Sequence, residues 1–105
     1  MAKKYRLAWT AQARADLRHI KGYIAQQAPR TAESVVRRIR ERCRGLLELP
    51  FGAPVVEEFG RDDLRETYFG SYRIIYEVSD GVVKIVTVFH AARQLLDTNL
   101  PRTDD

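Results

Sequence analysis

"LRETYFGSYRIIYEVSDGVVKIVTVFH" (64–90) contains three runs rich in β-branched and aromatic residues, separated by two short turns. Asp80-Gly81 stands between the second and third runs, and Asp-Gly flanked by such runs is the strongest short hairpin signal. Gly70-Ser71 provides a similar but weaker signal between the first two runs. The stretch therefore predicts an antiparallel sheet of three main strands.

A two-residue turn at Asp-Gly fixes the register of the last two strands. Glu77 then lies opposite Lys84, and this pair of opposite charges supports the register. The same count sets Arg73 across from Val88 and puts His90 on the face of Arg73, on the order of 7 Å away at the backbone. A slip of one residue would separate Arg73 from His90. We therefore expect a shared Arg73–His90 site in this register.

The predicted pairs divide the sheet into two sides, because directly paired residues share a face. One side is strongly apolar, and the helices should pack on it. The other side mixes polar and apolar groups, as a binding surface does. The apolar side comprises Thr67, Phe69, Tyr72, Ile74, Tyr76, Val83, Ile85, Thr87 and Phe89. The mixed side comprises Leu64, Glu66, Tyr68, Arg73, Ile75, Glu77, Lys84, Val86, Val88 and His90.

The N-terminal half predicts one strand and two helices. "YRLAW" (5–9) alternates as a half-buried strand, and Thr10 is suited to cap the helix that follows. Apolar residues every three or four positions describe that helix to about residue 27. Pro29 suits the first turn of a second helix, and the short break favours an antiparallel helical hairpin. The expected fold class is α+β: an N-terminal strand and a helical hairpin packed on an antiparallel sheet of three to four main strands. "VVEEFG" (55–60) is either a short strand or an irregular approach to the sheet.

The chain has 105 residues, of which 45% are hydrophobic and 30% charged, as in an ordinary globular domain. We expect a single domain over residues 1–98 and a flexible tail over 99–105. The sequence lacks the long apolar run of a membrane helix and the apolar core of a signal peptide, so a cytoplasmic protein with no membrane partner is expected. The single Cys43 lies in the apolar stripe of the second helix and is expected to be a small core residue. No metal-ligand pattern or cofactor is expected.

The charge is distributed unevenly along the chain. Residues 1–54 carry 12 Lys/Arg against 4 Asp/Glu, whereas residues 55–105 carry 6 against 10. A basic half suggests an anionic partner, either nucleic acid or an acidic protein segment. The polar face of the second helix, with Arg37, Arg38 and Arg44, is either a solvated face or a docking site for such a partner.

The order of these elements resembles the RelE/ParE superfamily of bacterial toxins from type II toxin–antitoxin modules. "YFGSYRIIYEV" within the sheet and "VFHAARQL" (88–95) at its end carry much of the resemblance. The opening "WTAQARADLRHIKGYIA" is similar to the family pattern of an aromatic residue, Ser/Thr, Ala and Asp-Leu. In this chain the pattern is carried by Trp9, Thr10, Ala13, Asp16 and Leu17.

The resemblance implies one of two activities. RelE-like members cleave mRNA in the ribosomal A site, and ParE-like members bind DNA gyrase and block its cleavage–religation cycle. RNA cleavage without a metal must activate a 2′-hydroxyl and stabilise charge on the phosphate, for which RelE-like enzymes use basic residues and often a C-terminal tyrosine. Arg73 matches the central arginine of the superfamily, and Arg93 falls near the later one. Leu64 and Glu66, however, replace basic residues, and no tyrosine follows Tyr76.

The sequence is therefore interpreted as a ParE-like toxin that is not an enzyme. "HAAR" is similar to the H-G-A-R corner of ParE-like toxins. The expected target-binding residues are Tyr68, Arg73, His90 and Arg93. In the alternative, a RelE-like endoribonuclease, the catalytic residues would be Glu66, Arg73, His90 and Arg93. A third hypothesis is an inactive homologue or a binding module.

Two of these residues also have purely structural interpretations. His90 could be a strand-end histidine that hydrogen-bonds to backbone, and Arg73 could serve only to form an ion pair with Glu66. The resemblance further implies a cognate antitoxin that binds the toxin through an amphipathic acidic segment, with Arg37, Arg38 and Arg44 as expected contacts. DNA would be contacted mainly through the antitoxin.

Overall fold

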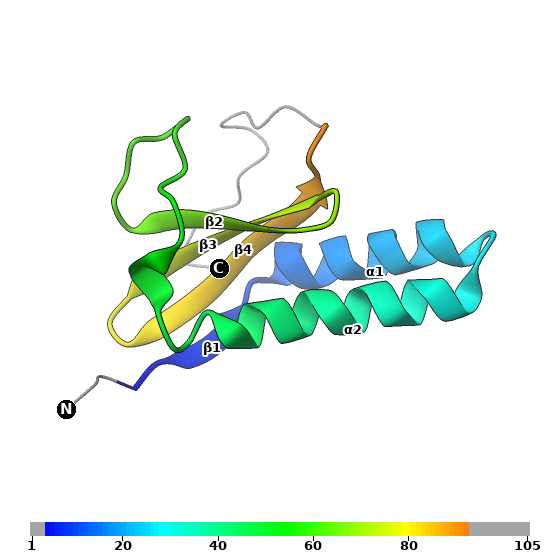
Figure 1. Ribbon diagram of the computed structural model, residues 1–105, viewed down its shortest axis with the longest axis horizontal. Coiled ribbons are helices and arrows are strands. Elements are labelled where there is room, and N and C mark those ends of the chain that lie inside the picture. The colour runs from blue at the N-terminus through cyan, green and yellow to red at the C-terminus, as the bar shows by residue number, and fades with distance from the viewer. Residues whose placement is uncertain (1–3, 93–105) are drawn as a thin grey trace.

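The computed structural model describes residues 4–92 and shows two helices covering one face of a four-stranded sheet (Figure 1). The predicted α+β fold class is confirmed. The proposed boundary between a domain at 1–98 and a tail at 99–105 lies outside the described residues, as does Arg93. The elements are β1 (Arg6–Trp9), α1 (Ala11–Ala25), α2 (Pro29–Gly45), a 3-10 turn (Pro50–Gly52), β2 (Leu64–Phe69), β3 (Tyr72–Ser79) and β4 (Val82–His90).

The strands lie in the order β1-β4-β3-β2. Both predicted hairpins are present, so that β2–β3 and β3–β4 are antiparallel pairs. The N-terminal strand lies parallel to β4, with Leu7 opposite Val83, and the sheet is therefore mixed rather than wholly antiparallel. Residues 55–60 form an irregular segment that touches β2 through a single bridge between Val55 and Arg65.

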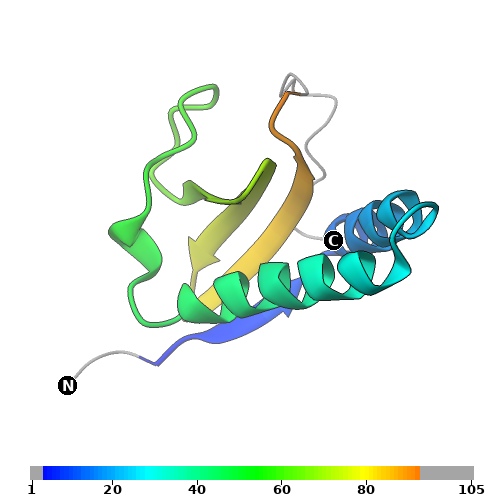
Figure 2. The same cartoon turned by 45° about the vertical axis from the view of Figure 1, so that its right-hand side comes forward.

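The helix starts follow the predicted signals. The Thr10 side chain accepts a hydrogen bond from the amide of Ala13 at 3.0 Å and so caps α1. Pro29 occupies the first turn of α2, where its missing N–H has no helical partner to lose. The two helices form the predicted antiparallel hairpin, and its far end extends beyond the sheet (Figures 1 and 2).

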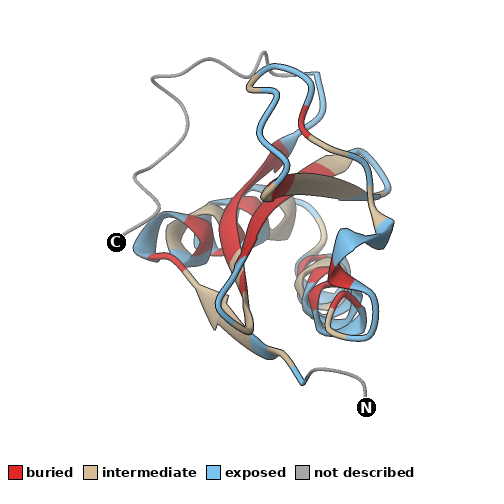
Figure 3. Cartoon of the chain, turned by 90° about the vertical axis from the view of Figure 1, so that its left-hand side faces the viewer, coloured by how far each residue is buried: buried red, intermediate tan, exposed pale blue. Residues whose placement is uncertain are grey.

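Each face of the sheet buries its own apolar cluster, and the buried residues concentrate on β3 and β4 (Figure 3). The larger cluster joins the helices to the sheet through Leu17, Ile39 and Tyr76, all at most 2% exposed. The smaller cluster lies on the opposite face and comprises Val56, Leu64, Ile75, Val86 and Phe89, with Phe59 packed against it. The irregular segment therefore covers part of the face that the helices leave open.

A β-bulge in β4 changes the predicted register. Pairs near the turn are as expected, with Ser79 opposite Val82 and Glu77 opposite Lys84. The register shifts by one between Ile75 and Tyr76, and beyond that point Arg73 lies opposite Phe89 and Tyr72 opposite His90. The bulge inserts one extra residue on β4, which reverses the sides of the residues that follow it.

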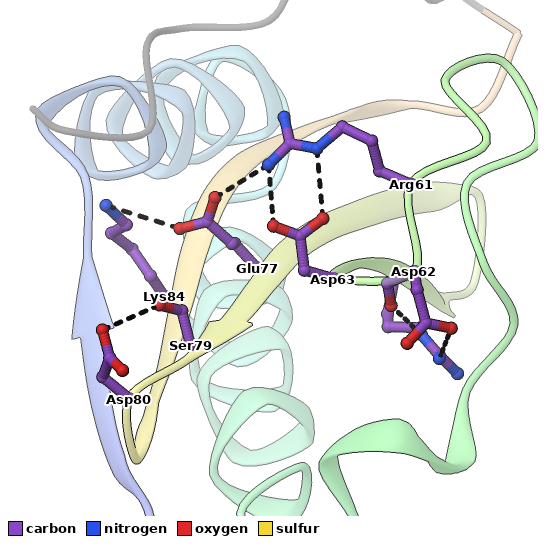
Figure 4. Close-up of polar contacts among 8 residues, drawn as sticks. Arg61, Asp62, Asp63, Glu77, Ser79, Asp80 and Lys84 are labelled. Carbon is purple, nitrogen blue, oxygen red and sulfur yellow. Dashed lines mark hydrogen bonds and ion pairs between the residues drawn. The ribbon is translucent and has the colours of Figure 1, made fainter.

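Charged side chains lie on β3 and β4 near the Asp80-Gly81 turn. The Arg61 guanidinium donates to the carboxylates of Asp63 and Glu77 at 2.8 and 3.1 Å (Figure 4). Lys84 Nζ lies 3.8 Å from a Glu77 oxygen, which confirms the predicted cross-strand charge pair. The Arg61 side chain is about half exposed, so its pair with Asp63 is screened by solvent, whereas the Glu77 side chain is only 11% exposed.

Candidate functional site

Arg73 is the centre of an ion-pair cluster on the face of the sheet that the helices leave open. Its guanidinium donates to both oxygens of Glu58 at 2.8 and 2.9 Å and also to Glu66. The guanidinium also lies 5.9 Å from the centre of the Phe89 ring. Glu58 comes from the irregular segment, Glu66 from β2 and Arg73 from β3, so three segments meet at one buried cation.

The positive charge of Arg73 is compensated by carboxylates within the cluster. Arg73 is only 9% exposed, and two carboxylates face it. Hydrogen bonds from Arg73 lower the pKa of Glu58 to about 2, while the Glu58 and Glu66 carboxylates raise the pKa of Arg73. The predicted Arg73–Glu66 ion pair is present. Sequence reasoning missed Glu58, because no local pattern in the irregular segment indicates its distant partner.

Tyr68 lies at the edge of this cluster. Its hydroxyl donates to Glu66 at 3.2 Å, and its side chain is among the exposed large aromatic groups. Partial burial and the Glu66 charge raise the pKa of Tyr68. An open cavity of about 710 Å³ lies beside these residues and is lined by Pro54, Val55, Glu57, Glu58, Glu66, Tyr68 and Arg73. Three of its lining residues are glutamates, so a phosphate group entering this cavity meets mainly negative charge.

His90 does not join Arg73, and the predicted shared site is wrong. The bulge places His90 opposite Tyr72, and the two rings meet edge to face at 5.9 Å. The bulge also reverses the predicted faces of Val88 and Phe89. Val88 lies in the cluster beneath the helices, and Phe89 lies in the cluster on the face of Arg73. The physical reason is the single extra residue in β4, because each step along a strand turns the side chain to the other face.

His90 instead lines a cavity of about 410 Å³ between α1 and the ends of β3 and β4. Its Nδ1 accepts a hydrogen bond from the Ala92 amide at 3.2 Å, which agrees with the structural interpretation of a strand-end histidine. The other lining residues are Asp16, His19, Ile20, Tyr23, Tyr72, Val88 and Phe89. Sequence reasoning missed His19 and Tyr23, although their spacing of four residues on α1 puts them on one helix face.

The arginines of α2 are exposed as predicted. Arg37 lies 3.6 Å from Glu41, and both side chains are more than half exposed, so this pair adds little stability. Arg37 and Arg44 are seven residues apart and share one face of the helix, whereas Arg38 lies on another flank. A shallow cavity of about 360 Å³ between the helices is lined by Lys21, Glu33, Val36, Arg37 and Arg40.

Cys43 lies on the buried face of α2 and is fully buried, and burial raises the pKa of its thiol to about 12. A protonated, buried thiol is a poor nucleophile, which supports the prediction of a small core residue. Over residues 4–92 no group of three or more His, Cys, Asp or Glu side chains could hold a metal ion. Within the same range no helix is long and apolar enough to cross a membrane.

Comparisons with known proteins agree with this fold. A family model described as the ParE toxin of the type II toxin–antitoxin system parDE matches residues 7–95. The chain is 38% identical over 91 residues to Toxin RelE2 of Caulobacter vibrioides, covering 83% of this chain and 96% of that protein.

Solved structures of toxin–antitoxin systems are among those similar to this chain. The chromosomal ParDE toxin–antitoxin system of P. aeruginosa has a TM-score of 0.72 at 20% identity, with 85% of this chain and 98% of that chain covered. The RelBE2 toxin–antitoxin complex of Mycobacterium tuberculosis has a TM-score of 0.54 at 27% identity, covering 83% and 98% of the two chains. The chain therefore belongs to the ParE toxin family of type II toxin–antitoxin systems, within the RelE/ParE superfamily.

Proposed function

We propose that this toxin inhibits DNA gyrase by stabilising its complex with cleaved DNA, and that it is not a nuclease. The observation that carries the proposal is the neutralised state of Arg73. A ribonuclease needs a cation that is free to bind the scissile phosphate, yet Arg73 is buried and bonded to Glu58 and Glu66. Over residues 4–92, the separation of His90 from this cluster also argues against a shared acid–base site.

The target surface that we propose is the end of the sheet near the Gly70-Ser71 turn. Tyr68 is exposed there on one face, and His90 is exposed on the other. Both residues therefore stand where a large protein could reach them, and exposed aromatic groups are common anchors in interfaces. Arg73 supports this surface by fixing Glu66, which accepts the Tyr68 hydroxyl. Arg93 remains a predicted contact.

A gyrase assay tests the proposal. Purified toxin should inhibit supercoiling of plasmid DNA by gyrase and should cause linear plasmid to accumulate. The antitoxin should prevent both effects when it is added first. Inhibition of supercoiling without linear DNA would point to another mode of gyrase inhibition and would overturn the proposed mechanism.

A ribonuclease function is the second candidate, because one relative, 38% identical, bears the name Toxin RelE2. In that case Glu66, Arg73, His90 and Arg93 would carry the reaction, and Arg73 would have to leave its carboxylate partners. Cleavage of mRNA on translating ribosomes, with no effect on gyrase, would establish this alternative. A folded protein with neither activity would be an inactive binding homologue.

We further propose that an antitoxin binds the helical hairpin through an acidic, amphipathic segment. The two solved structures described above are of toxin–antitoxin systems, and α1 and α2 expose many cations. Arg37 and Arg44 line one side of α2 and should contact the segment together, while Arg38 should contribute less because it lies on another flank. Autoregulatory DNA binding would then be supplied mainly by the antitoxin.

A further inference from the structure

The bulge in β4 is held from outside the sheet by Thr10, which caps α1, and by Asp16 in the second turn of that helix. The Thr10 hydroxyl donates to the carbonyl of Val86 at 2.8 Å while it caps the helix. Oδ2 of Asp16 accepts from the amide of Val88 at 2.9 Å and from the hydroxyl of Thr87 at 2.6 Å. The Val86 carbonyl and the Val88 amide are therefore hydrogen-bonded to Thr10 and Asp16 instead of to a neighbouring strand.

The hydrogen bonds to Asp16 are stronger than bonds between neutral groups and lie in a buried region. The Asp16 carboxylate forms charge-assisted hydrogen bonds, and Thr87 and Val88 are at most 4% exposed. A buried amide without a partner is costly, so the bulge needs an acceptor at the position of Asp16. Without that acceptor, a regular register in which Val88 bonds within the sheet competes with the bulged one.

The bulge decides which face of the sheet receives the last residues of β4. With the bulge, His90 meets Tyr72 and lines the cavity beside His19 and Tyr23 of α1. In a regular register, His90 would move to the face of Arg73. The cavity beside α1 would then lose one wall.

We infer that Asp16 is a positioning residue: by holding the bulge, it fixes His90 on the helix side of the sheet and so builds the cavity beside α1. The part of this inference that concerns toxicity rests on the proposed role of His90 in target binding. The part that concerns geometry stands on the hydrogen bonds alone. Thr10 and Asp16 of the opening motif therefore share one structural role, since both bond to β4.

Asp16→Ala and Asp16→Asn form a matched pair for the test. Alanine removes the acceptor, whereas asparagine retains one oxygen that can accept from both Thr87 and Val88. Gln12→Ala is a control on the same helix, because Gln12 donates to the other oxygen, Oδ1, of Asp16 and does not touch the bulge. All three variants keep the proposed target residues unchanged.

Hydrogen exchange and nuclear Overhauser contacts report the geometry directly. In Asp16→Ala the Val88 amide should exchange on the order of tenfold or more faster, as expected for the loss of a bond to a carboxylate. The contact between the Tyr72 and His90 rings should weaken or disappear. Asp16→Asn and Gln12→Ala should keep both signals close to those of the wild type. An unchanged ring contact in a folded Asp16→Ala variant would overturn the inference.

Gyrase inhibition separates this inference from the proposed function. If both hold, Asp16→Ala should lose most of the inhibition, and Asp16→Asn should restore it. If the wild type does not inhibit gyrase but the ring contact responds to Asp16→Ala, the positioning role stands and the proposed target falls. If inhibition is lost while the ring contact is unchanged, the positioning role falls and the proposed target stands.

Where Asp16→Ala does not fold, Thr87→Val is the second variant. Valine keeps the shape of threonine and removes one of the two hydrogen bonds to Asp16. A smaller acceleration of Val88 exchange is then expected, because the amide keeps its bond to Asp16. Exchange unchanged from the wild type would count against the inference.

Discussion

Replacing Arg73 with methionine tests the ion-pair cluster most severely. Methionine approximates the aliphatic part of the side chain but removes the guanidinium, and with it the cation near the Phe89 ring. Glu66 is then left 14% exposed with no cationic partner from this cluster, and Glu58 is left 39% exposed. Nearly all of the cost should come from Glu66, because water can solvate Glu58.

The loss in the free energy of unfolding follows from how far Arg73, Glu66 and Glu58 are buried. Removing one partner of a buried ion pair costs about 3–5 kcal/mol, whereas an exposed pair contributes about 0–1 kcal/mol. With Glu58 discounted for its exposure, we expect Arg73→Met to lower the free energy of unfolding by about 3 kcal/mol. Each kcal/mol lowers Tm by roughly 4–8 °C in a domain of this size, so the midpoint should fall by about 12–24 °C.

Urea and thermal unfolding at pH 7 measure this loss. Arg61→Met is the control, because Arg61 also bonds two carboxylates but is about half exposed, and its buried partner Glu77 keeps a second cation, Lys84, at 3.8 Å. It should therefore lose clearly less stability than Arg73→Met. The double variant Arg73→Met/Glu66→Gln should recover part of the stability by removing the unpaired charge. If Arg73→Met were as stable as the Arg61 control, Arg73 would not be a structural cation, and its release for phosphate binding would become the better account.

Three further predictions concern other parts of the chain. The pKa of Glu58 is about 2 when folded, below its ordinary value near 4.5, so its stabilising effect is present above pH 4.5 and is lost as the pH falls from 4.5 to 2. Glu58→Gln should therefore reduce the difference in unfolding free energy between pH 5 and pH 2.5, and an unchanged difference would show that Glu58 is not paired. Cys43 should react with a thiol reagent at pH 8 only as fast as the protein unfolds, because its pKa is about 12 and it is fully buried; rapid labelling of the native protein would contradict this. Arg37→Glu with Arg44→Glu should weaken antitoxin binding at least tenfold in titration calorimetry at low salt, and equal affinity would exclude the proposed α2 contact.

Local signals predicted most of the fold. The two glycine-containing turns gave both hairpins, and Thr10 and Pro29 marked the starts of the helices, because each signal acts within a few residues. The parallel pairing of β1 with β4 joins residues more than 70 positions apart and has no local signal. It depends on how the helical hairpin packs.

The site was less predictable because one residue of register decides it. The partners of the bulge, Thr10 and Asp16, lie 76 and 72 residues away from the backbone groups that they bond. Counting from the Asp80-Gly81 turn was therefore correct as far as Tyr76 and wrong beyond it. Thr10 and Asp16 were visible in the sequence as a motif, but their bonds to β4 appear only in three dimensions.

Capture of covalent gyrase–DNA complexes is the most direct test of whether the toxin stabilises gyrase on cleaved DNA. Gyrase, plasmid and ATP are incubated with the toxin, the reaction is stopped with detergent, and DNA that remains attached to protein is counted. Wild-type toxin should increase these complexes in proportion to its concentration, His90→Ala should reduce the increase, and the antitoxin should abolish it. A folded toxin that leaves the number of complexes unchanged would show that it does not stabilise gyrase on cleaved DNA.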